Sequence, residues 1–261
     1  MLRLVLLLLV FSTPSYAAYM GNICSPAVMQ TGLFGRFNYF LNVTSGYVSD
    51  ITWDKKIKPV NQPDYINLDS VKEFEIHSNW ASFALIFFRR LEFYTYLGVS
   101  KESMDWRSKP GSPKGSDLKT NNHFSGLAGV KLTLLRFSSF AIGVDAQFFT
   151  IPSSNKIIQK IRDIKLPFLV GRQYLKIKEW NVGGGISAFL GPLTPYAGIK
   201  HMKMRVRVKS STDLPTLKFD NRNTWGAFVG CSLSFSHNFY VNAEGRFNDE
   251  SAVGVSATAS F

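Results

Sequence analysis

The last eleven residues constrain the fold of this chain more than any other stretch. Over residues 251–261, apolar residues alternate with small or polar ones at a period of two, and the chain ends on Phe261. This period places the two sets of side chains on opposite faces of a β-strand. A strand with one face toward lipid and the other toward a lumen has this pattern. Residues 251–261 therefore predict the closing strand of an outer-membrane β-barrel, which barrel assembly machinery would bind at Phe261.

The start of the chain has the pattern of a secretory signal peptide. Arg3 precedes an apolar run over residues 4–11, Pro14 interrupts it, and small residues lead up to Ala17. Segments of this kind are removed on export. We expect a signal peptide over residues 1–17, an N-terminal segment over 18–44 and a barrel over 45–261.

Composition supports a β protein in a membrane. Mean hydropathy is near zero although 45% of the residues are hydrophobic, so the apolar residues are spread among polar ones. No segment after the signal peptide approaches the about 20 apolar residues of a spanning helix. A periplasmic or secreted β-sandwich is the alternative, because short alternating strands also suit sandwiches.

Hydrophobic alternation predicts ten strands joined as a meander of hairpins. The predicted strands are residues 45–56, 70–88, 91–104, 123–135, 140–150, 174–190, 194–209, 223–235, 239–248 and 251–261.

The connections between these strands alternate between short and long. Outer-membrane barrels have short periplasmic turns and long external loops, so the loop lengths place both termini on the periplasmic side. The turn at Asp249 and Glu250 should be external but is short. Residues 28–41 could form an extra strand, an internal plug or the lower half of a long first strand, and twelve strands are a further option.

Three stretches carry a resemblance to a known family. They are Glu179-Trp180 with the turn and strand over 193–200, the closing hairpin over 240–261, and the strand pair from 78–81 to 95–98. These stretches resemble the chlamydial major outer membrane porin family. The resemblance implies an outer-membrane barrel of a Gram-negative envelope that forms a diffusion pore, with a homo-oligomer as an option.

A run of basic residues is the most unusual local feature. Lys203, Arg205, Arg207 and Lys209 alternate with apolar residues and therefore share one face of a strand. If the turn at residues 191–192 pairs the flanking strands, opposite residue numbers sum to 383. Lys178 then faces Arg205, and Lys176 faces Arg207. Like charges directly opposite each other are destabilising, and a multivalent anion nearby would remove that cost.

The ligand of this basic run depends on which face it occupies. Without a β-bulge, the residues point outward just above an aromatic girdle that includes Trp180, where lipopolysaccharide phosphates lie. A bulge near residues 183–185 or His201 would turn them inward and make an anion-attracting pore mouth. Solvated strand ends are the third option. The formal charge of +12 does not indicate a nucleic-acid partner, because a signal peptide and a barrel account for it.

Four charged residues are predicted to face the lumen. Glu244 and Arg246 share the inward parity of one strand, while Lys131 and Asp145 face each other if opposite residue numbers sum to 276. Charges in a narrow lumen need partners. Barrels of about eight strands are filled by side chains and those of sixteen or more leave a channel, so ten to twelve strands predict a narrow pore.

The predicted function is passive, anion-preferring diffusion of small solutes, with outer-membrane lipids and lipopolysaccharide as the surrounding partners. A closed structural or adhesive barrel is the alternative, and the basic loop over residues 105–122 would serve adhesion. A hydrolase is disfavoured. His123 with Asp105 and Asp117 is the only acid/base grouping, and no Gly-x-Ser-x-Gly, Cys-x-x-Cys or His-Glu-x-x-His motif occurs. We therefore predict no catalytic residue, metal or cofactor.

The two cysteines exclude a dense disulfide scaffold. Cys231 lies in the middle of a predicted strand, on the same face as its apolar residues, which predicts a buried or lipid-facing thiol. Cys24, if exposed near the periplasmic N-terminus, could cross-link to a cysteine-rich envelope partner.

Overall fold

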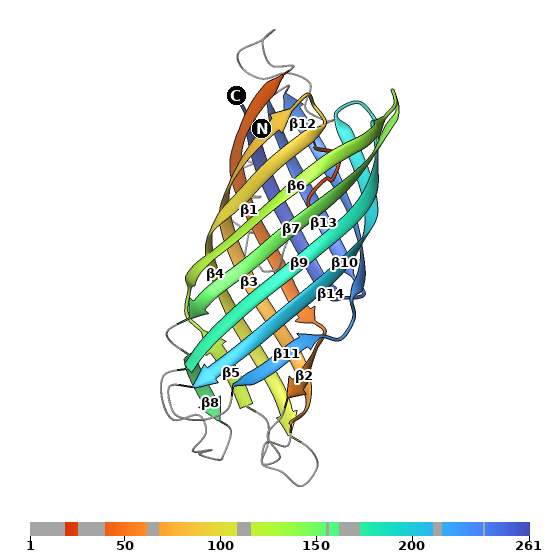
Figure 1. Ribbon diagram of the computed structural model, residues 1–261. Helices are drawn as coiled ribbons and strands as arrows, with labels where there is room; N and C mark the ends of the chain where they lie inside the picture. Colours follow the sequence, from red (N-terminus) through yellow and green to blue (C-terminus); the bar gives the residue numbers. More distant parts are fainter. Residues whose placement is uncertain are drawn as a thin grey trace.

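The computed structural model describes residues 19–25, 40–61, 68–108, 116–154, 157–161, 173–210, 216–236 and 238–261. Within these residues, ten long strands form one closed antiparallel barrel (Figure 1), as predicted. Neighbours follow the order β12-β13-β14-β1-β3-β4-β6-β7-β9-β10, and β10 pairs with β12 to close the wall. Their bounds are β1 Leu41–Lys55, β3 Leu68–Phe87, β4 Leu91–Ser108, β6 His123–Arg136, β7 Phe140–Ser154, β9 Gln173–Ala188, β10 Leu193–Ser210, β12 Trp225–Ser236, β13 Phe239–Phe247 and β14 Glu250–Ser260.

The first strand begins earlier than the sequence predicted. β1 starts at Leu41 rather than at residue 45, because the alternation of faces continues backward: Leu41 and Val43 are exposed, whereas Asn42 and Thr44 are buried. The barrel wall therefore includes residues 41–44. Residues 28–39, which could have formed an extra strand or a plug, lie outside the described residues.

Four stretches predicted as parts of loops are short strands at one end of the barrel. They are β2 Ile57–Asn61, β5 Ser116–Thr120, β8 Ile157–Ile161 and β11 Leu217–Asn221. β12 pairs with β10 only from Leu193 to His201, and β11 takes over as the partner of β10 from Arg205 to Val208. These strands extend the wall past the ends of the long hairpins. Alternation over five residues is too short to distinguish such strands from loops.

The two ends of the barrel differ in their connections. Figure 1 shows tight turns and the C-terminus at one end, and the short strands β2, β5, β8 and β11 at the other. The turn between β9 and β10 uses Gly191 at φ 65°, a left-handed conformation that glycine adopts without a Cβ clash. Short turns face the periplasm in such barrels, so the end with β2, β5, β8 and β11 is external.

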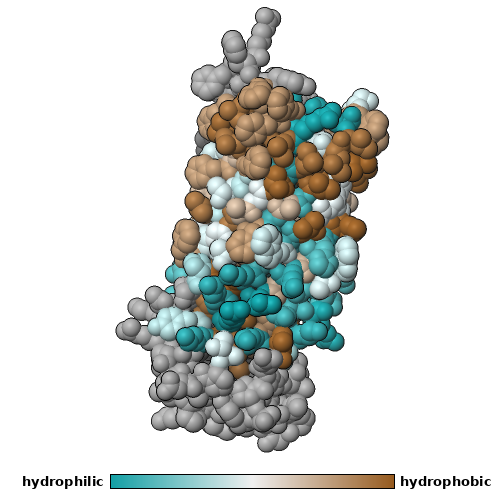
Figure 2. Space-filling view, viewed as in Figure 1, coloured by the Kyte–Doolittle hydropathy of each residue, from teal (hydrophilic) through white to brown (hydrophobic). Residues whose placement is uncertain are grey.

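An apolar belt covers the outside of the periplasmic half. Figure 2 shows this belt as a brown zone above a largely hydrophilic zone. Its exposed side chains include Phe83, Leu85, Phe93, Leu97, Val182, Ile186, Ile199, Val229 and Val255. A closed barrel satisfies its backbone hydrogen bonds within the wall, and an outward apolar belt then faces lipid. The fold is that of a transmembrane outer-membrane barrel. No helix in the described part of the chain is long and apolar enough to cross a membrane.

The chemistry of the two faces of β10 changes along its length, while its backbone alternation does not. Toward the periplasm, Ile199 points outward and Lys200 inward; farther out, Met202 and Met204 point inward and Arg205 outward. The register with β9 runs without a shift from Tyr196 opposite Ser187 to Ser210 opposite Gln173. The apolar side chains therefore change from the outer to the inner face where the wall leaves lipid.

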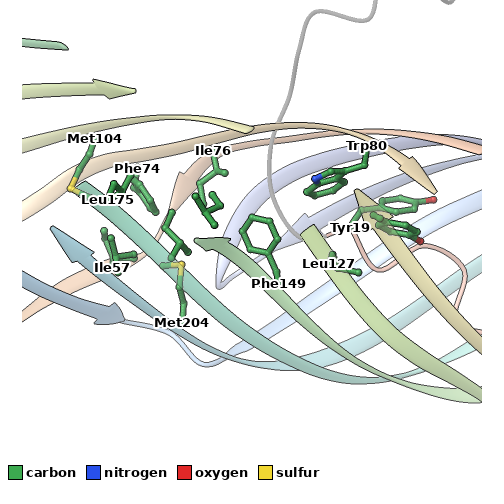
Figure 3. Close-up of a cluster of buried hydrophobic side chains, with 14 of the residues drawn as sticks. Tyr19, Ile57, Phe74, Ile76, Trp80, Met104, Leu127, Phe149, Leu175 and Met204 are labelled. Atoms are coloured by element: carbon green, nitrogen blue, oxygen red, sulfur yellow. The ribbon is translucent and has the colours of Figure 1, made fainter. Parts of the chain in front are cut away.

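An apolar core runs along the lumen, from Tyr19 and Tyr94 in the periplasmic half to Phe74 and Met104 in the external half. Its members come from most strands around the wall, and Figure 3 shows them inside the barrel, spread along its length. Phe74, Met104, Phe149, Leu175 and Met204 each have 0% exposure. Because the apolar side chains of the external half point inward, its outer surface carries mainly polar residues.

Candidate functional site: the basic face and the filled lumen

Six cations form one outward patch on β9 and β10, called here the basic face. In the register between these strands, Lys178 lies opposite Arg205 and Lys176 opposite Arg207, which are the pairs that the turn predicted. All members are exposed, and the inward neighbours of Arg205 and Arg207 are apolar. The basic face consists of Lys176, Lys178, Lys203, Arg205, Arg207 and Lys209. The alternative in which a bulge turns these residues into the lumen is wrong, because the β9–β10 register is continuous.

The basic face surrounds an open groove of about 320 Å³, lined by Lys176, Lys178, Lys203, Arg205, Arg207, Met204 and Trp180. A second groove of about 240 Å³ lies beyond Arg205 and Arg207, toward Val60 and Lys218. The two arginine side chains therefore border both hollows. A bound group in either hollow would meet guanidinium donors, which suit bidentate contacts to phosphate oxygens.

The cations of the basic face have few acidic partners. Among the described residues, the single ion pair of this face joins Arg205 Nε to Asp220 Oδ1 at 3.7 Å, and both side chains are partly exposed. An exposed pair of this kind contributes little. The like charges opposite each other on β9 and β10 are therefore left largely uncompensated within the described chain. A phosphate group placed between them would remove that repulsion.

An aromatic girdle marks the level of the basic face. Trp180 is 60% exposed, lies opposite Lys203 and packs on Phe148 with ring centroids 4.7 Å apart. Trp53 and Trp225 are also exposed. Exposed Trp side chains concentrate at the headgroup level of a bilayer. From Trp180 the basic residues continue outward to Lys176, a rise of roughly 13 Å along the strand.

The four charges predicted for the lumen are all buried inside the barrel. Lys131 lies opposite Asp145 in the β6–β7 register. Asp145 accepts hydrogen bonds from Tyr94 Oη at 2.9 and 3.0 Å, and Lys131 Nζ lies 3.8 Å from Glu92 Oε1. This pair is thus held by β4 as well as by its own hairpin.

Glu244 and Arg246 belong to a larger set, called here the ion layer, that crosses the middle of the lumen. Arg246 contacts both Asp50 oxygens at 2.8 Å, Glu250 at 2.8 Å and Glu244 at 3.2 Å. Lys200 lies between Asp249, at 3.0 Å, and Glu250, while Lys55 pairs with Glu179 and Glu250. The ion layer consists of Asp50, Lys55, Glu179, Lys200, Glu244, Arg246, Asp249 and Glu250. Every one of these side chains is fully or almost fully buried.

Asp249 and Glu250 were expected in an external turn, which is wrong. They are 0% and 1% exposed and face Lys200 inside the wall. The hairpin of β13 and β14 ends in the middle of the barrel, where β2 and β11 continue the wall, so its short turn reaches the ion layer. Glu179 and Lys200 were not predicted as lumen residues. Both alternate with outward residues of their strands, so strand alternation in the sequence was sufficient to predict that they point inward.

His123 has a different acidic partner from the one that the sequence suggested. Its Nε2 lies 3.1 Å from Glu102 Oε1, and its Nδ1 lies 2.7 Å from the carbonyl oxygen of Asn121. Asp105 and Asp117 are instead opposite each other in the β4–β5 register. Both ring nitrogens of His123 thus lie close to oxygen atoms of the wall. Residues 109–115 of the basic loop proposed for adhesion lie outside the described residues, whereas residues 105–108 and 116–120 belong to β4 and β5.

The periplasmic half of the lumen holds residues 19–25, called here the plug segment. Tyr19, Met20, Ile23 and Cys24 are each 0–1% exposed. Cys24 is therefore not the exposed thiol that a cross-link to an envelope partner would require. Both Cys24 and Cys231 are free thiols.

Comparison with known proteins gives structural neighbours only. No family model matches the chain, and no curated protein matches it. Outer membrane protease OmpT from Escherichia coli is 10% identical over 84% of this chain and 95% of that chain, with a TM-score of 0.40. The CymD monoaromatic hydrocarbon channel is 8% identical over 92% and 90%, with a TM-score of 0.35. The transport unit of the autotransporter AIDA-I from Escherichia coli is 12% identical over 90% and 93%, also at 0.35. The likeness is one of barrel architecture.

Proposed function

We propose that this protein is a closed outer-membrane barrel that binds the phosphate groups of lipopolysaccharide on its basic face. The observation that carries the proposal is the position of these cations. Lys178, Arg205 and Arg207 point away from the barrel beside the exposed Trp180, directly beyond the apolar belt. In a bilayer this is the level of the lipid headgroups.

The chemistry of the groove favours a phosphorylated lipid over a free anion. Arg205 and Arg207 offer planar donor forks, and Lys176 and Lys178 add point charges on the neighbouring strand. On the periplasmic side of these cations, Val182 and Ile186 are exposed on the same face of β9 and suit acyl chains. One ligand with phosphates beside the cations and hydrocarbon chains beside these apolar residues would satisfy both parts of this surface.

The packing of the lumen supports a closed barrel. The described interior contains the plug segment, the ion layer and the apolar core, and Tyr19 of the plug segment is part of that core. Beside the plug segment lies a cavity of about 20 Å³ bordered by Tyr94, Lys131 and Tyr240. A space of this size holds about one water molecule. A solute would have to displace the packed side chains of all three groups.

We expect the triple variant Lys178→Gln/Arg205→Gln/Arg207→Gln to bind lipid A about 100-fold more weakly than the wild type, because each basic residue at a lipid surface contributes about 1 kcal/mol. The measurement is a lipid A titration of folded protein in detergent, followed by native mass spectrometry. Dephosphorylated lipid A should bind both proteins equally weakly. Competition by inorganic phosphate alone would assign the site to a free anion instead.

The matched control removes the same charge elsewhere. Arg90, Lys101 and Arg136 are exposed outside the basic face, and their combined change to Gln should leave the lipid A affinity within about threefold of the wild type. If both triple variants lose affinity equally, net charge rather than the groove binds the lipid, and the proposal fails.

Passive diffusion of small anions is the second candidate, because charged residues such as Lys131 and Arg246 do face the lumen. In planar bilayers with a KCl gradient, we expect no stable conductance from the refolded wild-type barrel, because the plug segment, the ion layer and the apolar core fill its lumen. A stable conductance with an anion-directed reversal potential would instead favour diffusion. A reduced potential after Lys131→Gln, but not after Lys203→Gln/Arg205→Gln/Arg207→Gln, would place the ion path inside the barrel.

Three further predictions extend this proposal. The proposed relationship to the chlamydial porins rests on the resemblance of residues 193–200 and 240–261. The proposed lack of enzymatic activity rests on the position of His123, whose ring lies 3.1 Å from Glu102. The proposed homo-oligomer rests on the family resemblance alone. The proposed location of the protein is the bacterial cell outer membrane, because the signal peptide directs export, the barrel spans this membrane, and lipopolysaccharide is one of its lipids.

A further inference from the structure

The outward positive charge does not stop at β10 but continues onto β11. The register places Arg205 opposite Asp220 and Arg207 opposite Lys218. In the row of residues that crosses β9, β10 and β11, Arg207 therefore has Lys176 on one side and Lys218 on the other. Within the described part of the chain, no carboxylate pairs with any of these three cations. Like charges directly opposite each other are destabilising, so this row contains two repulsive contacts.

Lys218 belongs to the smaller of the two grooves beside the arginines. Its neighbours Leu217 and Phe219 are buried in the apolar core, so the Lys218 side chain points outward. The groove of about 320 Å³, called here the first groove, is lined by β9 and β10 alone. The groove of about 240 Å³, called here the second groove, reaches from β10 across β11 to Val60 on β2. The side chains that the two grooves share are those of Arg205 and Arg207.

A single phosphate would occupy the first groove. Five cations and no carboxylate line that groove, whereas three cations and Asp220 line the second. With one phosphate bound there, the repulsion between Arg207 and Lys218 would stay uncompensated. Asp220 does not relieve it, because this carboxylate lies opposite Arg205, with Oδ1 at 3.7 Å from Arg205 Nε. The second groove is therefore left in need of an anion of its own.

The two grooves are too far apart for one phosphate and close enough for one headgroup. Neighbouring strands lie about 4.8 Å apart, and side chains diverge on the convex outer surface of a barrel, so the groove centres are roughly 10 Å apart. A single phosphate does not extend over this distance. A sugar headgroup that carries a phosphate at each end does.

We propose that the second groove binds a second phosphate of the same headgroup, so that the preferred ligand is a sugar lipid with two phosphates held on either side of Arg205 and Arg207. This inference rests on the proposed binding of lipopolysaccharide phosphates and specifies how many phosphates bind and where. Each guanidinium group is planar and has several donors, so it can serve both phosphates. A glycerophospholipid with one phosphate would fill the first groove alone.

The test compares two forms of lipid A that have the same acyl chains but carry one or two phosphates. Folded protein in detergent is titrated with each form and read by native mass spectrometry. We expect the wild type to bind the diphosphorylated form about fivefold more tightly, the equivalent of about 1 kcal/mol for one added contact with a basic residue. Lys218→Gln should remove this preference and leave the affinity for the monophosphorylated form within about twofold of the wild type.

Lys178→Gln is the matched control, because Lys178 lines the first groove and not the second. It removes the same charge and should weaken the binding of both forms about fivefold. A heat-modifiable band on a gel confirms that each variant has folded.

The outcomes separate this inference from the proposed function. If the wild type binds both forms equally, lipid binding by the basic face stands and the second phosphate site is refuted. If Lys218→Gln weakens both forms equally, Lys218 acts through net charge, and the second site is again refuted. If about 1 mM inorganic phosphate abolishes the preference of the wild type, the second groove takes a free anion instead. If the wild type binds neither form, the proposed function itself fails.

Discussion

Replacing Arg246 with Met is expected to destabilise the folded barrel by about 3–5 kcal/mol, because removing one partner of a buried ion pair leaves its counter-charges unpaired. Arg246 contacts Asp50, Glu244 and Glu250, and all four side chains are 0% exposed. The measurement is urea unfolding in lipid vesicles, with the folded fraction read from gel mobility. Arg136→Met, at an exposed position, should change stability by less than about 0.5 kcal/mol.

A second substitution identifies the cause of the loss. Asp50 has both carboxylate oxygens on Arg246, so Asp50→Asn added to Arg246→Met should recover part of the stability, although Asp50→Asn alone destabilises the barrel. A wild-type-like stability of Arg246→Met would mean that water reaches the ion layer. The lumen would then be hydrated at its middle, as in a diffusion pore.

Trp80→Ala is also expected to destabilise the folded barrel by about 3–5 kcal/mol, because it removes the largest fully buried side chain among the described residues and leaves a cavity. The ring centroid of Trp80 lies 6.0 Å from that of Tyr96 and 5.9 Å from that of Phe149. The Trp80 Nε1 donates a hydrogen bond to Ser125 Oγ at 2.9 Å. The same urea titration measures the loss. An open lumen would let water replace the side chain at far smaller cost.

Trp80→Phe is the control for the hydrogen bond. It keeps most of the ring volume but removes the donor to Ser125, which still receives a hydrogen bond from Ser100 Oγ at 2.6 Å. We expect a loss of about 1 kcal/mol. If Trp80→Ala is no more destabilising than Trp80→Phe, the apolar core is not packed, and the closed barrel is untenable.

Much of the wall could be predicted from the sequence because strand alternation is a local property. All ten long strands were predicted, and the turn at residues 191–192 was sufficient to pair Lys178 with Arg205. The short strands β2 and β11 were missed because five residues carry too little alternation. They also pair with each other although they lie far apart along the chain, which no local pattern reveals.

The candidate site was predictable in its residues but not in its direction. Sequence identified the shared face of Lys203, Arg205 and Arg207, yet it left open whether lipid, lumen or solvent lies beyond that face. Parity is fixed along β10, but the inner side chains change from polar to apolar beyond Lys200. That change follows from the height at which the wall leaves lipid, and this height depends on the whole barrel.

By itself, the sequence determined a ten-stranded antiparallel wall and the order of its hairpins, because period-two alternation and turn lengths act between chain neighbours. Only the tertiary structure decided what fills the lumen. Residues 19–25 reach β14, and Asp50 reaches Arg246, across about two hundred residues of chain. Such contacts exist only once the wall has closed and brought opposite strands within reach of one side chain, so no local pattern of residues could specify them.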